Sequence, residues 1–472
     1  MVFSSMVFLC VFLPAAFCLH LLLPGMRAKN FLLVVASLVF YAYGEPIYVI
    51  LLVASSAGNY ILARLTGECP KIRKLTMTLA VVINLGLLVI FKYSGFLVET
   101  FNSVTGAGIP VPQVRMPIGI SFFTFQALSY VIDVYRGDAS VQKNFGKVLL
   151  YISFFPQLIA GPIVKYHDVE AEINNRKQTP EEIGKGIRRF IAGLSKKVLI
   201  ANTMGLVADN LFGAAATGIT GPGAWLGAVS YMLQIYFDFS GYSDMAIGIS
   251  WILNLDLPVN FNSPYKAYSV VEFWKRWHIS LTRFLTKYIY IPLGGSRKGN
   301  LRTYCNTMIV FLCSGIWHGA SWMFVLWGAL HGVAMVLAKV LKRYGEWIPR
   351  ILKRSVTLLF INFTWIIFRT ADLKELREVF RAFLKGGISI NPDLFQFFGI
   401  AGKGAEEYAV LYSILVLLAI IGILVFLLIA PNAKEAAEKM KYKVWHGFVA
   451  AGIIALCVLR FSSVSSFVYF NF

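Results

Sequence analysis

The sequence has few charged residues for its length. Asp, Glu, Lys and Arg make up 14% of the 472 residues, against about 25% in an average soluble domain. Hydrophobic residues make up 57%, and no long polar block interrupts the apolar stretches that recur from end to end. This shortage of charge excludes a series of soluble domains and favours a single membrane-embedded domain spanning residues 1–472.

Cysteine is scarce, and its spacing is uninformative about ligands. The six Cys residues include no Cys-x-x-Cys pair, and most lie within apolar stretches. This pattern is not typical of a zinc site or a disulfide framework, and it predicts small buried apolar side chains instead. We therefore expect no metal.

Acidic residues are rarer than basic ones, which leaves a net charge of +20. A basic chain can indicate nucleic-acid binding, but here Lys and Arg lie in short loops between apolar stretches. That distribution is typical of cytoplasmic loops beside anionic lipid, so we expect these charges to meet membrane lipid and no nucleic acid. Working outward from the loops places the N-terminus outside the membrane, and the C-terminus as well. The basic loops lie at 64–74, 165–197, 266–302, 339–354 and 434–443.

The apolar stretches predict an all-α integral membrane protein, because about 20 apolar residues in a helix cross a bilayer. The first stretch has no basic segment before it, which favours a membrane helix over a cleaved signal peptide. Pieces near 146–160, 272–291 and 304–316 carry charge, Gly or Pro, and such pieces survive at membrane depth only where protein or a water-filled cavity surrounds them. We therefore predict a ring of about 11 transmembrane helices around re-entrant segments and a central tunnel. The candidate spans are 2–23, 30–43, 46–63, 75–98, 118–135, 187–212, 224–252, 320–341, 355–368, 408–429 and 446–460.

Two other segments have the pattern of polar or amphipathic helices. Thr179 is predicted to cap a helix that begins at Pro180, with a Glu closing a capping box. Residues 372–385 place apolar side chains on one helical face and charges on the rest, which is typical of a helix lying on the membrane surface. The topology puts this amphipathic helix on the outer surface, where it is either a packing element or a docking surface for a partner. Its predicted apolar face is Leu373, Leu376, Phe380, Phe383 and Leu384.

Two segments rich in Trp and His, at 273–281 and 314–322, could carry chemistry within the core region 270–332. His318 has no acidic residue nearby in sequence, and an ionisable side chain within a membrane is a functional candidate because it is costly to bury. A neutral imidazole suits general-base chemistry, since its unperturbed pKa is about 6.5. The alternative is a core His that is hydrogen bonded to a neighbouring helix. His278 could converge with His318 on one cavity. His331 would lie about 20 Å from His318 along an unbroken helix, at the far end of the tunnel.

Two acidic residues, Asp238 and Asp244, lie in an otherwise apolar stretch. Buried acids need partners, and Tyr242 and the hydroxyl beside it are too close in sequence to supply a full set. Another helix must therefore contribute. We interpret these acids as part of a structural hydrogen-bond network in preference to a catalytic group.

The order and spacing of these motifs resemble the membrane-bound O-acyltransferase family. The Trp-Lys-Arg-Trp-His of 274–278 and the Trp-His-Gly of 317–319 are similar to two signature motifs of that family. The first of these carries Asn or His, and the second carries the catalytic His. The similarity covers nearly the whole chain and is greatest to the bacterial polysaccharide-acetylation branch, typified by the alginate O-acetylation membrane subunit. The further matching stretches are 1–14, 40–46, 117–125, 161–163, 237–244 and 467–472.

The resemblance implies an O-acyltransferase, a multi-pass enzyme of the bacterial plasma (inner) membrane. Its expected donor is acetyl-CoA on the cytoplasmic side, and the acyl group would pass through a tunnel to an exopolysaccharide or cell-wall glycan. A separate extracytoplasmic SGNH-type acetyltransferase, or another protein that handles the acceptor, is the expected partner. D-alanyl transfer from a carrier protein to teichoic acid is an alternative, as is a transporter or scaffold without covalent chemistry. A transporter is disfavoured because the sequence has no internal repeat.

The resemblance also implies roles for individual residues. His318 would act as general base on the acceptor hydroxyl, or would hold the acyl group transiently. His278 would orient the acyl group or donate a hydrogen bond to its carbonyl oxygen. Lys275 and Arg276 would either contact the phosphates of coenzyme A or anchor the chain at the cytoplasmic surface. Three tryptophans would line the tunnel or pack beside it: Trp274, Trp277 and Trp317.

Overall fold

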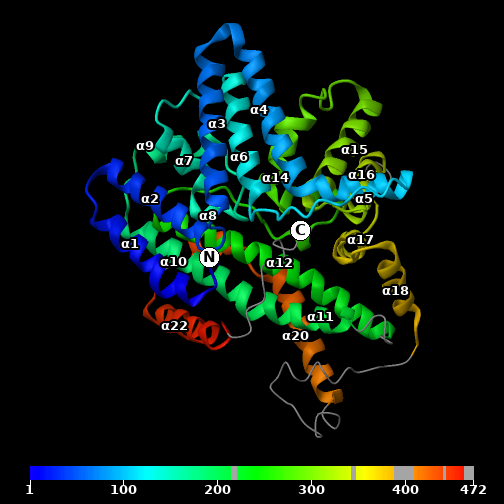
Figure 1. Cartoon of the computed structure of the whole chain (residues 1–472). Coiled ribbons are helices and arrows are strands. Elements are labelled where there is room, and N and C mark those ends of the chain that lie inside the picture. Colours follow the sequence, from blue (N-terminus) through cyan, green and yellow to red (C-terminus); the bar gives the residue numbers. More distant parts are fainter. Residues whose placement is uncertain (214–219, 342–346, 387–408, 440–442, 462–472) are drawn as a thin grey trace. The chain divides into compact units, whose positions relative to one another are not determined.

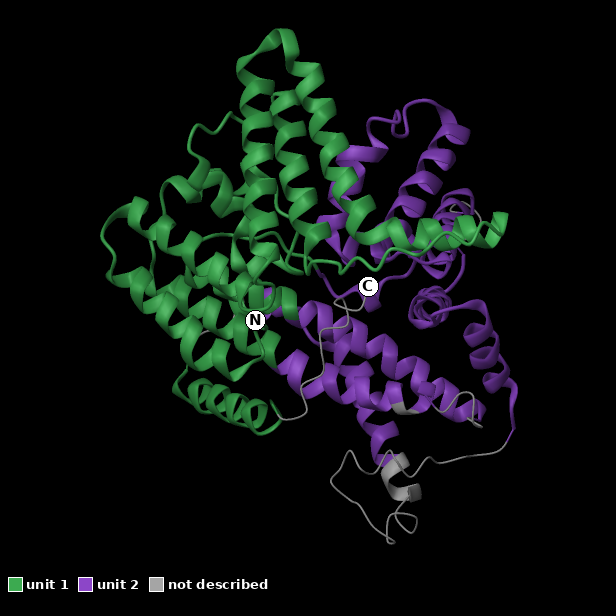
Figure 2. Ribbon diagram, viewed as in Figure 1, with its two compact units in different colours: residues 1–194, 242–260, 437–461 green, residues 195–241, 261–436, 462–472 purple. Residues whose placement is uncertain are grey.

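The structure is a computed structural model that describes residues 1–213, 220–341, 347–386, 409–439 and 443–461 (Figure 1). Regular structure in these ranges is helical, which confirms the all-α prediction. The helices form two compact units that interleave along the sequence (Figure 2). Unit 1 contains residues 1–194, 242–260 and 437–461, and unit 2 contains 195–241 and 261–436. The terminal stretch 467–472, which contributed to the family resemblance, lies outside the described residues.

Unit 1 is organised around α3, α4 and α6, which pack against one another. Polar side chains pair between these helices: Asn59 of α3 and Asn84 of α4 each donate to the other, at 3.2 and 2.7 Å. Interhelical hydrogen bonds of this kind stabilise helix packing in membranes, where apolar burial between helices contributes little. The unit comprises η1 (Phe8–Phe12), α1 (Leu13–Leu22), α2 (Gly25–Ala42), α3 (Tyr48–Glu68), η2 (Pro70–Ile72), α4 (Arg73–Leu88), η3 (Val89–Tyr93), α5 (Ser94–Thr105), α6 (Ile120–Arg136), α7 (Phe145–Ser153), α8 (Phe155–Leu158), α9 (Tyr166–Asn174), α10 (Pro180–Ser195) and α22 (Val444–Leu459).

Unit 2 is built on a hairpin of α15 and α16, which pack closely along their length. Gly315 and Gly328 allow this approach, because a Cβ on either would collide with a backbone carbonyl of the opposite helix. Small residues serve the same purpose at other helix interfaces in membranes. The elements are η4 (Lys196–Ala201), α11 (Asn202–Gly213), α12 (Gly221–Ile252, which ends in unit 1), η6 (Pro264–Lys266), α13 (Val270–Arg276), α14 (Ile279–Leu285), η7 (Thr286–Tyr290), α15 (Gly299–His318), α16 (Trp322–Val340), α17 (Arg350–Arg369), α18 (Leu373–Leu384), α20 (Ala409–Ile429) and α21 (Ala433–Lys439).

Six helical segments among the described residues are long and apolar enough to cross a membrane. The stretch predicted at 30–43 lies in α2 up to Ala42, and α2 begins at Gly25 and so gains the length that the apolar stretch lacks. The predicted spans 118–135 and 224–252 correspond to α6 and α12, whose residues are mostly buried in the protein. A multi-pass membrane protein is thus confirmed, and the count of about 11 spans stays a prediction. The six segments are Gly25–Ala42, Tyr48–Glu68, Pro70–Thr105, Pro180–Gly213, Trp322–Val340 and Arg350–Arg369.

The predicted helix start at Thr179 is confirmed. α10 begins at Pro180, and the Thr179 hydroxyl accepts a hydrogen bond from the Glu182 backbone N–H at 3.2 Å. This contact satisfies one of the N–H groups that the first turn of a helix leaves without a partner.

The amphipathic helix is also present, as α18, but its buried face differs from the predicted one. Val379 and Ala382 are its buried residues, whereas Leu373 and Leu384 are 64% and 88% exposed. The predicted face was therefore too wide at both ends of the helix. The ring of Phe380 lies 5.2 Å from Phe363 of α17, and the ring of Phe383 lies 4.9 Å from Trp225 of α12. These contacts support the packing interpretation of α18, and the docking interpretation stays a prediction.

The reciprocal amide pair predicts a measurable coupling between α3 and α4. Asn59→Ala and Asn84→Ala should each lower the free energy of unfolding. The double variant should lose less stability than the two single losses added together, with a coupling of about 0.6–1.7 kcal/mol. Unfolding of the purified protein in mixed detergent micelles measures this. Val82→Ala, at an exposed position of α4, is the control and should have little effect. Additive losses would show that the two amides do not stabilise each other.

Candidate active site

His278 lies where the backbone breaks between two short helices. α13 ends at Arg276 and α14 begins at Ile279, and His278 between them has φ 44° and ψ 52°. This left-handed conformation is uncommon outside glycine and occurs often at functional sites. The side chain is fully buried, and its ring lies 4.8 Å from Phe239 of α12. The apolar stretch 272–291 is therefore interrupted inside the protein, as predicted.

His318 lies at a second break, as the last residue of α15. Gly319 follows in an extended conformation, and α16 starts at Trp322 after Ser321 caps it by accepting from the Met323 N–H. The carbonyl end of a helix carries partial negative charge and stabilises a nearby positive charge by about 0.3–1 kcal/mol. An imidazole that gains a proton during a reaction is therefore favoured at this position.

The two imidazoles lie close together, as predicted, whereas the one cavity that they would share stays a prediction. Their ring centroids are 6.4 Å apart with an angle of 61° between the planes. Trp317 lies beside both, 5.9 Å from the His278 ring and 4.9 Å from the His318 ring. Trp327 and Phe368 also contact His318, at 5.1 and 5.3 Å. The pair is thus held in an aromatic environment where both rings can contact one small group.

The predicted position of His331 is wrong. The prediction assumed an unbroken helix after His318, but the chain turns at 319–321 and α16 runs back along α15. His331 therefore lies near His318, with Trp327 between them at 5.1 Å from the His318 ring and 4.7 Å from the His331 ring. The Trp274 indole N–H donates to His331 Nδ1 at 3.2 Å, and His331 Nε2 lies 3.1 Å from Thr364 Oγ1. Because Nδ1 accepts, we assign the ring proton to Nε2, which donates to Thr364.

A cavity of about 210 Å³ lies among α13–α16 and η7. Trp274 and Ser314 line one end, and Ser314 is one helical turn before His318. Thr307 and Lys339 line the other end, where Lys339 Nζ donates to Thr307 Oγ1 at 2.9 Å. The rise of α15 between Thr307 and Ser314 corresponds to about 10 Å. The cavity therefore runs along α15 from a cationic end toward the end of the helix that carries His318, through mostly apolar surroundings. Neither His278 nor His318 is among the residues that line it.

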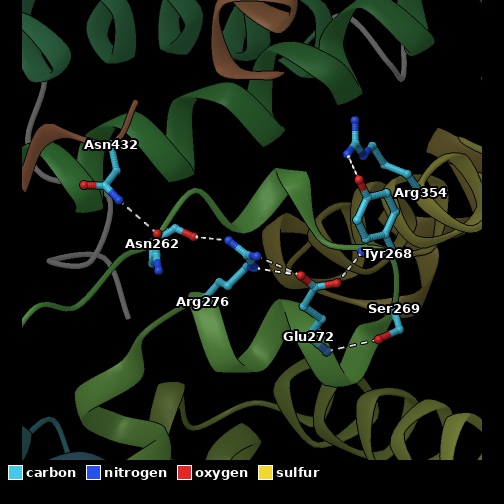
Figure 3. Close-up of polar contacts among 7 residues, drawn as sticks. All are labelled: Asn262, Tyr268, Ser269, Glu272, Arg276, Arg354 and Asn432. Carbon is cyan, nitrogen blue, oxygen red and sulfur yellow. Dashed lines mark hydrogen bonds and ion pairs between the residues drawn. The ribbon is translucent and has the colours of Figure 1, made fainter. Parts of the chain in front are cut away.

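Arg276 and Lys275 do not line this cavity. Arg276 forms an ion pair with Glu272 at 2.8 Å and donates to the Asn262 carbonyl at 3.1 Å (Figure 3). Glu272 also accepts from the Tyr268 N–H, so these contacts fix the start of α13. Lys275 is exposed. The contacts of Arg276 support the anchoring interpretation, and phosphate binding by either residue stays a prediction.

Trp277 packs away from the cavity that Trp274 lines. Its ring lies 4.9 Å from Trp365 and 5.0 Å from Phe261, and it is not among the residues around the cavity. Trp274 lines the cavity and Trp317 contacts both imidazoles, so two of the three predicted tryptophans lie at the candidate site.

The buried acids have the partners from other elements that we predicted. Asp238 pairs with Lys197 of η4 at 2.6 Å within unit 2, and Asp244 pairs with Arg189 of α10 at 3.0 Å within unit 1. All four side chains are nearly inaccessible to solvent. Tyr242 belongs to unit 1, where its ring stacks on Phe3 at 4.7 Å. These contacts support a structural role for the acids.

Sequence reasoning missed several residues of the site: Trp327, Lys339, Thr364 and Phe368. Lys339 carried a usable signal, because it lies in the last turn of a long apolar helix, where cations mark the membrane boundary. Thr364 and Phe368 lie in an apolar helix whose orientation becomes known only when α17 packs against α16. No local pattern distinguishes them from other packing residues.

Comparison with known proteins identifies relatives over most of the chain. The family model for the membrane-bound O-acyltransferases matches residues 139–369, which contain the His pair. The chain is 39% identical over 446 residues to the probable alginate O-acetylase AlgI of Azotobacter vinelandii, covering 92% of this chain and 88% of the relative. It is 38% identical over 429 residues to the peptidoglycan O-acetyltransferase of Helicobacter pylori, covering 83% and 80%. The teichoic acid D-alanyltransferase of Bacillus subtilis is 25% identical over 267 residues, covering 53% and 67%.

The ion pair of Asp238 and Lys197 predicts a strong effect on stability. Asp238→Ala should destabilise the protein by about 3–5 kcal/mol, because it leaves a buried ammonium without its counter-charge. The double variant Asp238→Leu with Lys197→Met should recover most of this loss, since it removes both charges. Unfolding in mixed micelles measures the stability, and acyl transfer is assayed in parallel. A double variant that is stable but inactive would contradict the structural role of Asp238.

Proposed function

Because the chain belongs to the membrane-bound O-acyltransferase family, we propose that it transfers acetyl groups across the membrane for the O-acetylation of an exopolysaccharide or cell-wall glycan. The identity of 38–39% to an alginate and a peptidoglycan acetylation protein over more than four fifths of the chain supports this acceptor class. The similarity to a teichoic acid D-alanyltransferase is lower and covers about half of the chain. Acetyl-CoA is the proposed donor.

The observation that carries this proposal is the buried pair of imidazoles, 6.4 Å apart. In the proposed reaction, His318 accepts the proton of the acceptor hydroxyl as its oxygen attacks the thioester carbonyl. His278 donates a hydrogen bond to the carbonyl oxygen as negative charge develops. The carbon–sulfur bond then breaks, and the leaving thiolate takes the proton from His318. The new ester is released with free coenzyme A, and the protein returns to its starting state.

The cavity beside the pair suits the acyl end of the donor. Its volume of about 210 Å³ is below the range of about 300–1,000 Å³ that is typical of pockets for whole ligands. It can hold an acyl group and part of a narrow thioester arm, while the nucleotide stays outside. Lys339 at the opposite end supplies a cation for a phosphate.

The charge distribution supports entry of the donor from the cytoplasm. α15 begins and α16 ends beside the basic loops 266–302 and 339–354, which the positive-inside rule places on the cytoplasmic side. The cavity's cationic end lies at this side of the hairpin. The same rule gives an N-terminus outside the bacterial plasma membrane. We further propose that an SGNH-type acetyltransferase outside the membrane receives the acetyl group and completes its transfer to the glycan.

The first prediction of this function concerns His318. His318→Ala should lower acyl transfer by at least about 100-fold, because a positioned general base contributes about 10²–10⁴ in rate. Membrane vesicles from producing cells, given radiolabelled acetyl-CoA, allow both free coenzyme A and glycan ester to be measured. His167→Ala is the control, since this partly exposed residue pairs with Asp168 in unit 1. Wild-type activity in the His318 variant would remove this residue from the mechanism.

The second prediction is that the two imidazoles act as a unit. His278→Ala should lower the rate sharply, and adding His318→Ala should cost little more, because both residues serve one transition state. His278→Asn should retain more activity than His278→Ala, since an amide can still donate to the acyl oxygen. Single-turnover rates of the three variants provide the measurement. If the two single losses simply multiply in the double variant, His278 is an independent packing or binding residue.

A further inference from the structure

The cavity ends at the indole of Trp274 on the side of the His pair. Trp274 lines the cavity together with Ser314 and Phe311. Its ring lies 5.7 Å from Trp327, which in turn lies 5.1 Å from the His318 ring. A donor whose arm enters the cavity from the Lys339 end would therefore place its acyl group against this indole.

The indole is held in place by a buried chain of hydrogen bonds. Its N–H donates to His331 Nδ1 at 3.2 Å, His331 Nε2 donates to Thr364 Oγ1 at 3.1 Å, and Thr364 donates to the Ile361 carbonyl at 2.9 Å. His331 and Thr364 are fully buried, and Trp274 is nearly so. Breaking such a chain would leave buried polar atoms without partners, at about 1–3 kcal/mol for each. The indole is therefore a fixed wall of the cavity.

The family chemistry proposed above does not itself require His331, which lies behind the cavity wall. His331 contacts Trp274, Trp327 and Phe360, at 5.2, 4.7 and 5.3 Å between ring centroids. A packing residue in this position could have been an apolar side chain. An imidazole instead offers the acceptor that fixes the orientation of the indole.

We propose that Trp274 sets the length of the transferred acyl group, and that His331 is the positioning residue that holds the indole in place. This inference rests on the proposed acyl transfer and identifies which acyl groups that site accepts. A two-carbon acyl group fits in front of the indole, while each further methylene must displace it. In closely packed interiors such overpacking costs about 1–3 kcal/mol. Removing the indole opens space, since even a Leu→Ala change can leave a cavity of about 150 Å³.

The test compares acetyl-, propionyl- and butyryl-CoA as donors for purified protein in lipid vesicles, with release of free coenzyme A as the readout. Trp274→Ala should raise the butyryl-to-acetyl ratio of kcat/KM by at least about tenfold, which corresponds to about 1.4 kcal/mol. His331→Leu should raise the ratio less, because the indole stays but loses its acceptor. His331→Asn should restore the wild-type ratio, since its Oδ1 can replace Nδ1 as acceptor.

Phe360→Leu is the matched control, because it removes a ring that contacts His331 and leaves both hydrogen bonds of the imidazole intact. Its ratio should equal that of the wild type. If all variants lose acetyl and butyryl transfer in parallel, Trp274 and His331 have only a structural role and the inference is wrong. Should Trp274→Ala fail to elute as a folded protein, His331→Leu and His331→Asn decide the question in the same way. A wild-type protein that uses no acyl-CoA would instead overturn the proposed function.

Discussion

The site depends on one constraint: where a helix stops inside the protein, the surrounding structure must satisfy the backbone polar groups that its end leaves unpaired. In the described part of unit 2, helices stop at two places that bring buried histidines together, between α13 and α14 and between α15 and α16. Each break carries a buried histidine, His278 in a left-handed conformation and His318 at the end of a helix. The close packing of α15 on α16, which Gly315 and Gly328 allow, brings the second break to its place. The arrangement of the two histidines is thus a consequence of where the helices stop.

The aromatic surroundings give these breaks their chemistry. Trp317, Trp327 and Phe368 contact His318 on several sides, so an imidazole there works in a low-dielectric environment, where hydrogen bonds to a developing charge are strong. A separate cavity runs from Trp274 and Ser314, one helical turn before His318, to a cationic end at Lys339. A donor with an anionic end and a small acyl group matches a cavity that has one cationic and one apolar end. This agreement between fold, site and family supports acyl transfer over transport.

Much of the architecture could be predicted from the sequence because its signals are local. Hydropathy predicted an all-α membrane protein, and the need of buried acids for partners predicted that Asp238 and Asp244 pair with other elements, as they do with Lys197 and Arg189. The motifs suggested that His278 and His318 could converge, and their rings lie 6.4 Å apart. The position of His331 could not be predicted, because it depends on the turn after His318. The buried face of α18 was wrong for a similar reason: tertiary packing on α17 and α12 decides which side of an amphipathic helix is covered.

The central claim is that this chain carries out acyl transfer from a cytoplasmic thioester to an acceptor on the opposite side of the membrane. Sealed vesicles of defined orientation, supplied with radiolabelled acetyl-CoA on one face, test it directly. The account predicts one free coenzyme A for each acetyl ester formed, with activity only when the donor meets the face bearing the 64–74 and 339–354 loops. Acetyl esters without release of coenzyme A, or equal activity from both faces, would contradict it.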